Sequence, residues 1–357
     1  MRVLVYGAGI AGLTAALELA RAGARVEVAD PRGPGAGATS RAAGIVTLQM
    51  PGALEEWAME AIEAYTRLGA ARRVHGVVVA PRPCVERLLS ERLVASGLAG
   101  GLTASEASRL VGHEVRVPEG WGAAYTLDAL VDVGGLVSAL TARLEALGVS
   151  LGRRAPSPYE ASLGGYDAVV VAAGAWTPAV LGVEPREIAG SSLYNCEASS
   201  VALPEGSRQE AILYVESGVD AAYSVPEAPG RAIVGDGPNN VIESPLDAAP
   251  TPGAVYQVLE TLAEAAPAYL DAYPTASWAA PCLITGDGLP AVGEWVEGIY
   301  ILAGLDGYGL MAAPALARLL AHNITRGTPL PGWLDPHRRA SPWRGEGPPP
   351  EPFRGCS

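Results

Sequence analysis

The hydrophobic pattern changes in kind along the chain. Residues 3–6 are a short β-branched run, typical of a buried parallel strand, and residues 11–22 place leucine and alanine on one helical face. A second strand over residues 25–29 completes a βαβ unit. Residues 192–242 instead alternate apolar and polar side chains between Pro and Gly turns, which indicates an antiparallel sheet. We therefore predict an α/β protein with a Rossmann-like, mostly parallel sheet and an additional α+β part.

The same patterns predict the remaining elements. Helical periodicity occurs over residues 53–70, 86–97, 104–111, 136–147, 252–265 and 312–326. Further buried strands are expected over residues 74–80, 166–176 and 298–304. The end of the chain after Pro329 is rich in Pro, Arg and Gly, and we expect it to form a tail that wraps around the protein or extends from it.

Composition narrows the class of protein. The chain has 357 residues, of which 49% are hydrophobic and 18% charged, and this suffices for a globular protein with two domains. Its net charge of −13 argues against a surface that binds nucleic acid or anionic lipid. No run of about 18 apolar residues occurs, so no membrane span is expected. Because the N-terminus enters a strand directly, without a signal peptide, we expect a cytoplasmic protein.

Neither cysteine nor histidine forms a metal-binding pattern. The four cysteines lie far apart, without a CxxC pair, at Cys84, Cys196, Cys282 and Cys356. We expect free buried thiols, with a disulfide as the alternative if the source is a hyperthermophile. His75 and His113 stand alone in the sequence, and we expect them to be structural.

A glycine loop marks a dinucleotide site. Gly7, Gly9 and Gly12 satisfy the pattern G-x-G-x-x-G between the first strand and the first helix. The glycines permit a tight turn and a close approach of pyrophosphate to the N-terminus of the helix. Asp30 ends the second strand, where it can accept hydrogen bonds from ribose hydroxyls and would repel a 2′-phosphate. The loop therefore predicts NAD or FAD, not NADP.

The segment Ala38–Gly44, with the sequence ATSRAAG, favours FAD. It resembles the segment after the second strand in the D-amino-acid oxidase family of FAD-dependent oxidoreductases, which includes glycine oxidase, sarcosine oxidases and amino-acid dehydrogenases. The resemblance implies that Thr39 and Ser40 reach the phosphates of FAD. It also implies that the backbone at Ala43 and Gly44 passes beside the isoalloxazine ring.

Further motifs of the same family follow in order, so that the resemblance covers residues 1–326. They are Val131–Leu136, Ala172–Trp176, Tyr223–Pro226, Trp278–Ala279, Thr285–Gly293 and Ala303–Pro314. In the last motif, the resemblance places backbone amides from Tyr308 to Met311 near N1 and C2=O of the flavin, where negative charge develops on reduction. Asp132, within the first of these motifs, is expected simply to cap a helix.

The resemblance implies a set of site residues. The implied FAD contacts are Gly7, Gly9, Ile10, Ala11, Gly12, Asp30, Pro31, Thr39, Ser40, Arg41, Ala43, Gly44, Ala173, Gly174, Trp176, Gly304, Asp306, Gly307, Tyr308, Gly309, Leu310 and Met311. The implied residues at the reacting centre are Tyr308, Gly309, Arg41 and Tyr223. No Cys or His stands where relatives attach flavin covalently, so we expect non-covalent FAD.

The sequence departs from the family at the substrate anchor. Amino-acid oxidases of the family often carry an arginine four positions after the tryptophan, and here that position is Cys282. We expect another arginine to bind a substrate carboxylate, with Arg41 as the first candidate and Arg116 and Arg208 as alternatives.

The resemblance also implies the activity and the domains. We expect oxidation of a C–N bond in a small amino acid or secondary amine, with hydride transfer to flavin N5 to give an imine, and O2 or another electron acceptor. A hydroxy-acid or polyol dehydrogenase, or a non-catalytic FAD-bearing subunit of a larger complex, remains an alternative. The expected FAD-binding domain comprises residues 1–75, 128–186 and 277–330, the substrate domain 76–127 and 187–276, and the tail 331–357.

Overall fold

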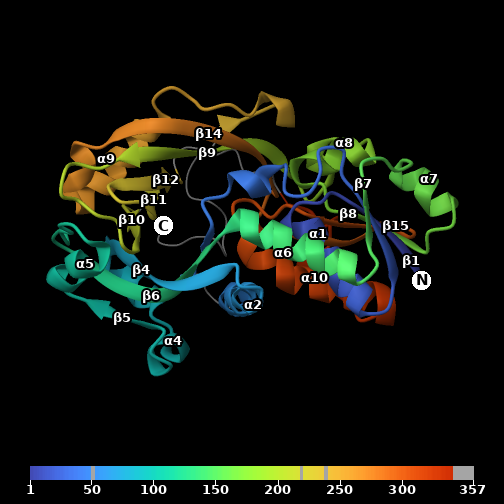
Figure 1. Ribbon diagram of the computed structural model, residues 1–357, viewed down its shortest axis with the longest axis horizontal. Helices are drawn as coiled ribbons and strands as arrows, with labels where there is room; N and C mark the ends of the chain where they lie inside the picture. Colours follow the sequence, from blue (N-terminus) through green and yellow to red (C-terminus); the bar gives the residue numbers. More distant parts are fainter. Residues whose placement is uncertain (50–52, 218–219, 237–239, 341–357) are drawn as a thin grey trace.

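Two β-sheets dominate the structure. The computed structural model describes residues 1–49, 53–217, 220–236 and 240–340. Figure 1 shows the sheets in neighbouring halves of the molecule, with the N-terminus in the half that contains β1 and α10. Strands β9 (Ser192–Ala202) and β14 (Tyr273–Ile284) run together along one edge of the other half.

The first sheet has the order β15-β16-β8-β1-β2-β7. Its strands pair in parallel, except for the antiparallel pair β15–β16. Their bounds are β1 (Arg2–Tyr6), β2 (Arg25–Ala29), β7 (Ser150–Gly152), β8 (Ala168–Val171), β15 (Ala291–Val296) and β16 (Ile299–Ala303). Valine fills β1, β2 and β8 because the sheet is covered on both faces.

Helices enclose the first sheet. One face packs against α1 (Ile10–Arg21), α6 (Val133–Ala146) and α10 (Gly309–Arg326), with α2 (Ala53–Arg67) outside α10. The short helices α7 (Pro158–Leu163) and α8 (Thr177–Leu181) lie on the opposite face. This arrangement directs the N-termini of α1 and α10 to the same edge of the sheet, since β1 leads into α1 and β16 into α10.

The second sheet is mostly antiparallel and has the order β13-β9-β12-β11-β10-β4-β6-β3, while β14 pairs with β9 and β5 with β6. Beyond β9 and β14, its strands are β3 (Ile45–Val46), β4 (Ala71–Pro81), β5 (Ala99–Leu102), β6 (Trp121–Val131), β10 (Ile212–Glu216), β11 (Ala221–Ala228), β12 (Arg231–Gly235) and β13 (Asn240–Val241). Helices α5 (Ala104–Val111) and α9 (Ala254–Ala265) share a buried apolar cluster with one face. On the other face a buried cluster of Val74, Ile212 and Val225 is covered by Tyr214 and Tyr223 of the sheet and by Ala43 and Ile45, which belong to the ATSRAAG segment and the strand after it.

The predicted fold class is confirmed by this pair of sheets. The single helix predicted over residues 86–97 is wrong in detail, because α3 (Arg82–Leu88) and α4 (Glu91–Ala95) replace it and Ser90 caps the second helix. Strands β6 and β14 were not predicted. Among the described residues, no helix is long and apolar enough to cross a membrane. The domain boundaries stay a prediction, and residues 341–357 of the predicted tail lie outside the described residues.

Candidate functional site

The glycine loop has the geometry of a pyrophosphate site. Gly7 has a φ of +97°, and a Cβ there would lie 2.3 Å from the carbonyl oxygen of Ala172. A Cβ on Gly12 would lie 1.8 Å from the carbonyl oxygen of Gly7, so only glycine permits this crossing of strand and helix. Helix α1 begins after Gly9, which has no side chain to cap it, so the N–H groups of Ala11 and Gly12 in its first turn are left for an anion.

Asp30 and Thr39 close the loop from either side. The two carboxylate oxygens of Asp30 accept 2.9 Å hydrogen bonds, one from the N–H of Ala8 and one from that of Arg32. Each oxygen keeps a second lone pair, so the ribose contact predicted for Asp30 remains available. The hydroxyl of Thr39 accepts a 3.0 Å bond from the N–H of Ile10. These residues fit the adenosine and pyrophosphate of FAD.

The predicted ring-facing loop is fixed to the second sheet. Gly44 has a φ of +78°, and a Cβ there would lie 2.5 Å from the carbonyl oxygen of Val131. The N–H of Val131 donates a 2.8 Å hydrogen bond back to the carbonyl of Gly44. Ala43 and Tyr223 pack against the same buried cluster of Val74, Ile212 and Val225, so this loop borders the second sheet.

The turn before α10 presents few free amides. The N–H of Tyr308 donates to Leu305 at 2.9 Å, and the N–H of Met311 donates to Tyr308 at 3.0 Å. The N–H groups of Gly309 and Leu310 donate no hydrogen bond within the described part of the chain. Of the amides predicted to face the flavin, these two are the ones available for that role.

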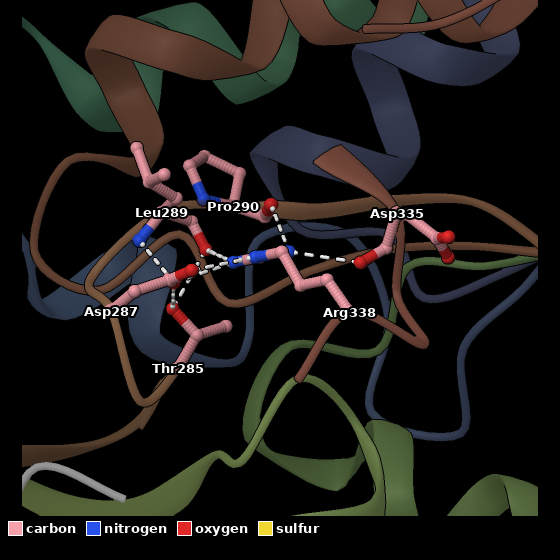
Figure 2. Close-up of polar contacts among 6 residues, drawn as sticks. All are labelled: Thr285, Asp287, Leu289, Pro290, Asp335 and Arg338. Carbon is pink, nitrogen blue, oxygen red and sulfur yellow. Dashed lines mark hydrogen bonds and ion pairs between the residues drawn. The ribbon is translucent and has the colours of Figure 1, made fainter. Parts of the chain in front are cut away.

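An ion pair between Arg338 and Asp287 fixes the turn at residues 285–290, and Figure 2 shows it. The guanidinium of Arg338 donates 2.7 Å bonds to both carboxylate oxygens of Asp287, and also bonds the carbonyls of Leu289 and Pro290. The hydroxyl of Thr285 donates to Leu289 at 2.7 Å. Burial opposes ionisation of Asp287, but the bonds and charge of Arg338, together with bonds from Leu289 and Thr285, outweigh it and hold the pKa of Asp287 below its usual range.

The turn held by Arg338 contacts the turn before α10. A Cβ on Gly304 would lie 2.7 Å from Cγ2 of Thr285, and Gly304 has a φ of +66°. The two turns are therefore in close contact, and the position of one restricts the position of the other. Arg338 belongs to the predicted tail, and no pattern in the sequence indicates that it supports this region.

Three acidic side chains from different elements interact beside this turn. The protein atoms around Asp306 and the charge of Asp236 raise the pKa of Asp306 to about 7. Burial and Asp236 raise the pKa of Glu216 to about 7, against a smaller opposing effect of Arg87. Asp236 is exposed, yet the protein around it raises its pKa to about 6. The region therefore carries acidic groups that titrate near neutral pH.

The backbone at two of these acids is strained. The non-glycine residues with positive φ in the described ranges are Ala189, Asp236 and Asp306, with values of 47°, 75° and 46°. Left-handed backbone is unfavourable for residues with a Cβ and persists where surrounding structure enforces it. Two of the three strained positions thus belong to the acidic group, as is common at functional sites.

Two tyrosines complete the group. Burial and nearby carboxylates raise the pKa of Tyr223 and that of Tyr308 well above the ordinary value. Tyr223 lies opposite Gly235 in the sheet, and a Cβ on Gly235 would lie 2.3 Å from the phenol oxygen. Glycine at this position makes room for the phenol directly beside Asp236.

The expectation of free thiols is wrong for the three described cysteines, Cys84, Cys196 and Cys282. Cys196 and Cys282 form a disulfide between β9 and β14, although 86 residues separate them in sequence. None of the cysteines in the described ranges is a free thiol. The two cysteines meet because β9 and β14 pair side by side, which their spacing in sequence does not reveal.

The candidate arginines are distributed over different surfaces. Arg41 donates a 2.6 Å bond to the carbonyl of Ala279, and Trp278 donates to the carbonyl of Arg41 at 2.8 Å. Arg116 and Arg208 pair with exposed glutamates on the second sheet's outer side. Asp132 caps α6 through the N–H of Gly135 at 2.9 Å, as predicted.

Other predicted residues have structural partners. His113 bonds Gln209 at 2.9 Å and packs against Tyr269, in agreement with a structural role. Trp176 stacks under the guanidinium of Arg32, whose Cζ lies 3.8 Å from the ring centroid. Ser40 is exposed and donates to the carbonyl of Gly37 at 3.1 Å. Contacts of these residues with FAD stay predictions.

Comparison with known proteins gives the family. The sequence profile described as FAD dependent oxidoreductase matches residues 2–323. The chain belongs to this family of FAD-dependent oxidoreductases. The predicted family, its FAD dependence and its enzymatic class are thereby confirmed. A glycine oxidase from Pseudomonas aeruginosa is 26% identical over 396 aligned positions, which cover 94% of this chain and 97% of the relative.

Two solved structures share the fold. An L-proline dehydrogenase from P. horikoshii is 23% identical with a TM-score of 0.78, covering 94% of this chain and 97% of its own. A glycine oxidase from Geobacillus kaustophilus is 23% identical with a TM-score of 0.73, covering 95% of this chain and 100% of its own. At this identity the likeness establishes the fold, and the substrate has to be argued from the residues of this chain.

Proposed function

We propose that this flavoenzyme oxidises a C–N bond in a small amine or amino acid, with FAD held non-covalently. The observation that carries the proposal is the group of Glu216, Asp236 and Asp306 with the phenols of Tyr223 and Tyr308, next to the turn before α10. When bound, FAD supplies the chemistry by accepting a hydride from the carbon next to nitrogen, which leaves an imine.

The charge of this group favours the amine end of a substrate. A carboxylate in a partly apolar site needs a cationic partner, and Cys282, at the position where relatives carry arginine, is bound in a disulfide. Acidic side chains instead attract a protonated amine. We therefore propose that cationic amines are better substrates than zwitterionic amino acids.

The same residues suit the proton transfer that the reaction needs. An amine gives up a hydride only after its ammonium group has lost a proton. Glu216 and Asp306, with pKa values of about 7, are partly ionised at neutral pH, so either carboxylate can take that proton. Tyr223 and Tyr308 remain protonated at that pH and can donate hydrogen bonds to the substrate.

An amino-acid substrate would require one of the nearby arginines. Arg87 is close enough to Glu216 to lower its pKa, and Arg41 borders β14 through its bond to Ala279. Either guanidinium could bind a substrate carboxylate as a bidentate partner. Arg87→Ala and Arg41→Ala would then raise KM for amino acids strongly and KM for simple amines little.

Anaerobic bleaching of the flavin absorbance tests the proposal. We expect small primary or secondary amines and diamines to reduce the bound flavin, and uncharged hydroxy compounds to leave it oxidised. Asp236→Asn is expected to raise KM for cationic amines about tenfold or more, the effect of roughly 1.4 kcal/mol of lost attraction. Glu63→Gln, which changes an exposed glutamate, is the matched control.

Three results would contradict the proposal. Reduction by hydroxy acids or polyols alone would identify a C–O oxidising enzyme. Preference for amino acids, lost in Arg87→Ala or Arg41→Ala, would show that a carboxylate anchor operates. An isolated chain that binds FAD but is reduced by no compound in the panel would indicate a non-catalytic subunit.

A further inference from the structure

The Cys196–Cys282 disulfide lies beside a carboxylate. Cys196 is in β9 and Cys282 in β14, and these strands pair throughout the range Ser192–Ala202. The two sulfur atoms and a carboxylate oxygen of Asp306 all lie within 4.8 Å of one another. Asp306 reaches this place from the turn before α10, a third segment of the chain.

These three groups form the donor set of a zinc site once the sulfur atoms are separate. Thiolates bind Zn²⁺ at about 2.3 Å and carboxylates at about 2.0–2.2 Å, which places ligand atoms within about 4 Å of one another. Thiolate donors disfavour Mg²⁺ and Ca²⁺.

We propose that reduction of the Cys196–Cys282 disulfide opens a zinc site whose protein ligands are Cys196, Cys282 and Asp306. In the disulfide form the sulfur atoms are bonded to each other, so the site is closed. Three protein ligands leave a fourth position for water or a small molecule, as in other open zinc sites.

Reduction of the Cys196–Cys282 disulfide requires an external reductant that supplies two electrons. A phosphine breaks the bond between the two sulfur atoms: it gives two electrons and becomes a phosphine oxide, while water supplies its oxygen and the two thiol protons. Zinc then replaces both thiol protons, so about two protons are released for each ion bound. A dithiol reductant achieves the same reduction by forming its own disulfide.

The location of the proposed zinc site means that bound zinc would affect the enzyme. Asp306 belongs to the turn before α10, which is predicted to lie beside the flavin. Zinc held there would occupy the same end of the site as a cationic substrate. The redox state of Cys196 and Cys282 would then decide whether zinc inhibits the enzyme. This consequence rests on the proposed function, whereas zinc binding itself does not depend on it.

The experiment compares the oxidised and reduced forms of the FAD-loaded protein. Protein reduced with a phosphine and desalted without oxygen is titrated with Zn²⁺ in a calorimeter, in two buffers of different ionisation enthalpy, to count released protons. Co²⁺ is the spectroscopic probe, because its thiolate complexes absorb at longer wavelengths than flavin. We expect one ion per reduced chain, about two protons released, and no such binding by the oxidised form.

Variants separate this site from other thiols and from misfolding. Asp306→Asn keeps both cysteines and is expected to weaken zinc binding more than the roughly 10- to 100-fold that loss of an outer-shell partner costs. Cys282→Ser is expected to abolish the cobalt–thiolate band, whereas Cys84→Ser should retain it. The proposal is overturned if both redox forms bind zinc equally, if Asp306→Asn binds normally, or if only Cys84→Ser loses the ion.

Discussion

Tyr214 donates a 3.0 Å hydrogen bond to the carboxylate of Asp128, which has no exposed surface. The other oxygen of that carboxylate accepts a 2.9 Å bond from the N–H of Leu48. Gly76 in β4 leaves room for this carboxylate, because a Cβ at Gly76 would lie 2.1 Å from Oδ2 of Asp128. A buried acid thus joins strands of the second sheet to the chain that continues from the predicted ring-facing loop.

We expect Tyr214→Phe to destabilise the protein by about 1–3 kcal/mol, because it leaves a buried carboxylate short of a donor. Burial already raises the pKa of Asp128, and the bonds from Leu48, Thr126 and Tyr214 oppose that rise. Urea denaturation followed by circular dichroism measures the loss. Tyr256→Phe, at a tyrosine that is 56% exposed, should change the free energy of unfolding little. Equal losses in both variants would refute a specific role of the Asp128 bond.

Arg338→Ala should release the turn around Asp287. The guanidinium is 11% exposed and its bidentate bond is lost, so we expect about 1–3 kcal/mol less stability at neutral pH. Arg339→Ala, at the exposed neighbouring residue, is the matched control. Because the folded pKa of Asp287 is lowered, its contribution is present above its unfolded pKa and disappears as pH falls through the folded value. The difference between Arg338→Ala and wild type should therefore shrink in acid, and a constant difference would contradict the ion-pair explanation.

The acidic group should also make the free energy of unfolding depend on pH, but in the direction opposite to that of Asp287. The folded pKa values of Asp306 and Glu216 are about 7, well above their ordinary values of 3.8 and 4.5. Between these limits the folded protein binds more protons than the unfolded chain, so the free energy of unfolding falls as pH rises. Asp306→Asn should flatten this decline between pH about 5 and about 7, while Glu63→Gln should preserve it. Denaturant titrations across this range test the expectation, and an unchanged slope in Asp306→Asn would rule it out.

Asp30→Ala should weaken FAD binding by about 1–3 kcal/mol, because a charge-assisted contact to the ribose is removed. Its loss also frees the N–H groups of Ala8 and Arg32, which loosens the loop around the pyrophosphate. Fluorescence titration of the FAD-free protein gives the affinity, and Glu63→Ala serves as the exposed acidic control. FAD affinity equal to that of the wild type would contradict the predicted contact of Asp30 with the ribose.

Local sequence determined the cofactor half of this protein. Gly7, Gly12 and Asp30 act over one βαβ unit, where strand, turn and helix follow one another directly, so spacing alone predicts their geometry. The helices and valine-rich strands of the first sheet follow from periodicity for the same reason. The family motifs, in their order along the chain, indicate FAD without any knowledge of the contacts between them.

Only the tertiary structure assembled the group of acidic residues proposed to bind the substrate. Glu216, Asp236 and Asp306 come from separate segments, and Cys196 meets Cys282 across 86 residues, so no spacing in the sequence reveals either group. Strand β6 was missed because the charged Asp128 interrupts its apolar pattern. That carboxylate is tolerated inside the sheet because Leu48 and Tyr214, both remote in sequence, satisfy it with hydrogen bonds. Contacts between residues remote in sequence thus decided where the acidic side chains lie. Their burial and hydrogen bonding depend on neighbours that only the folded chain brings together.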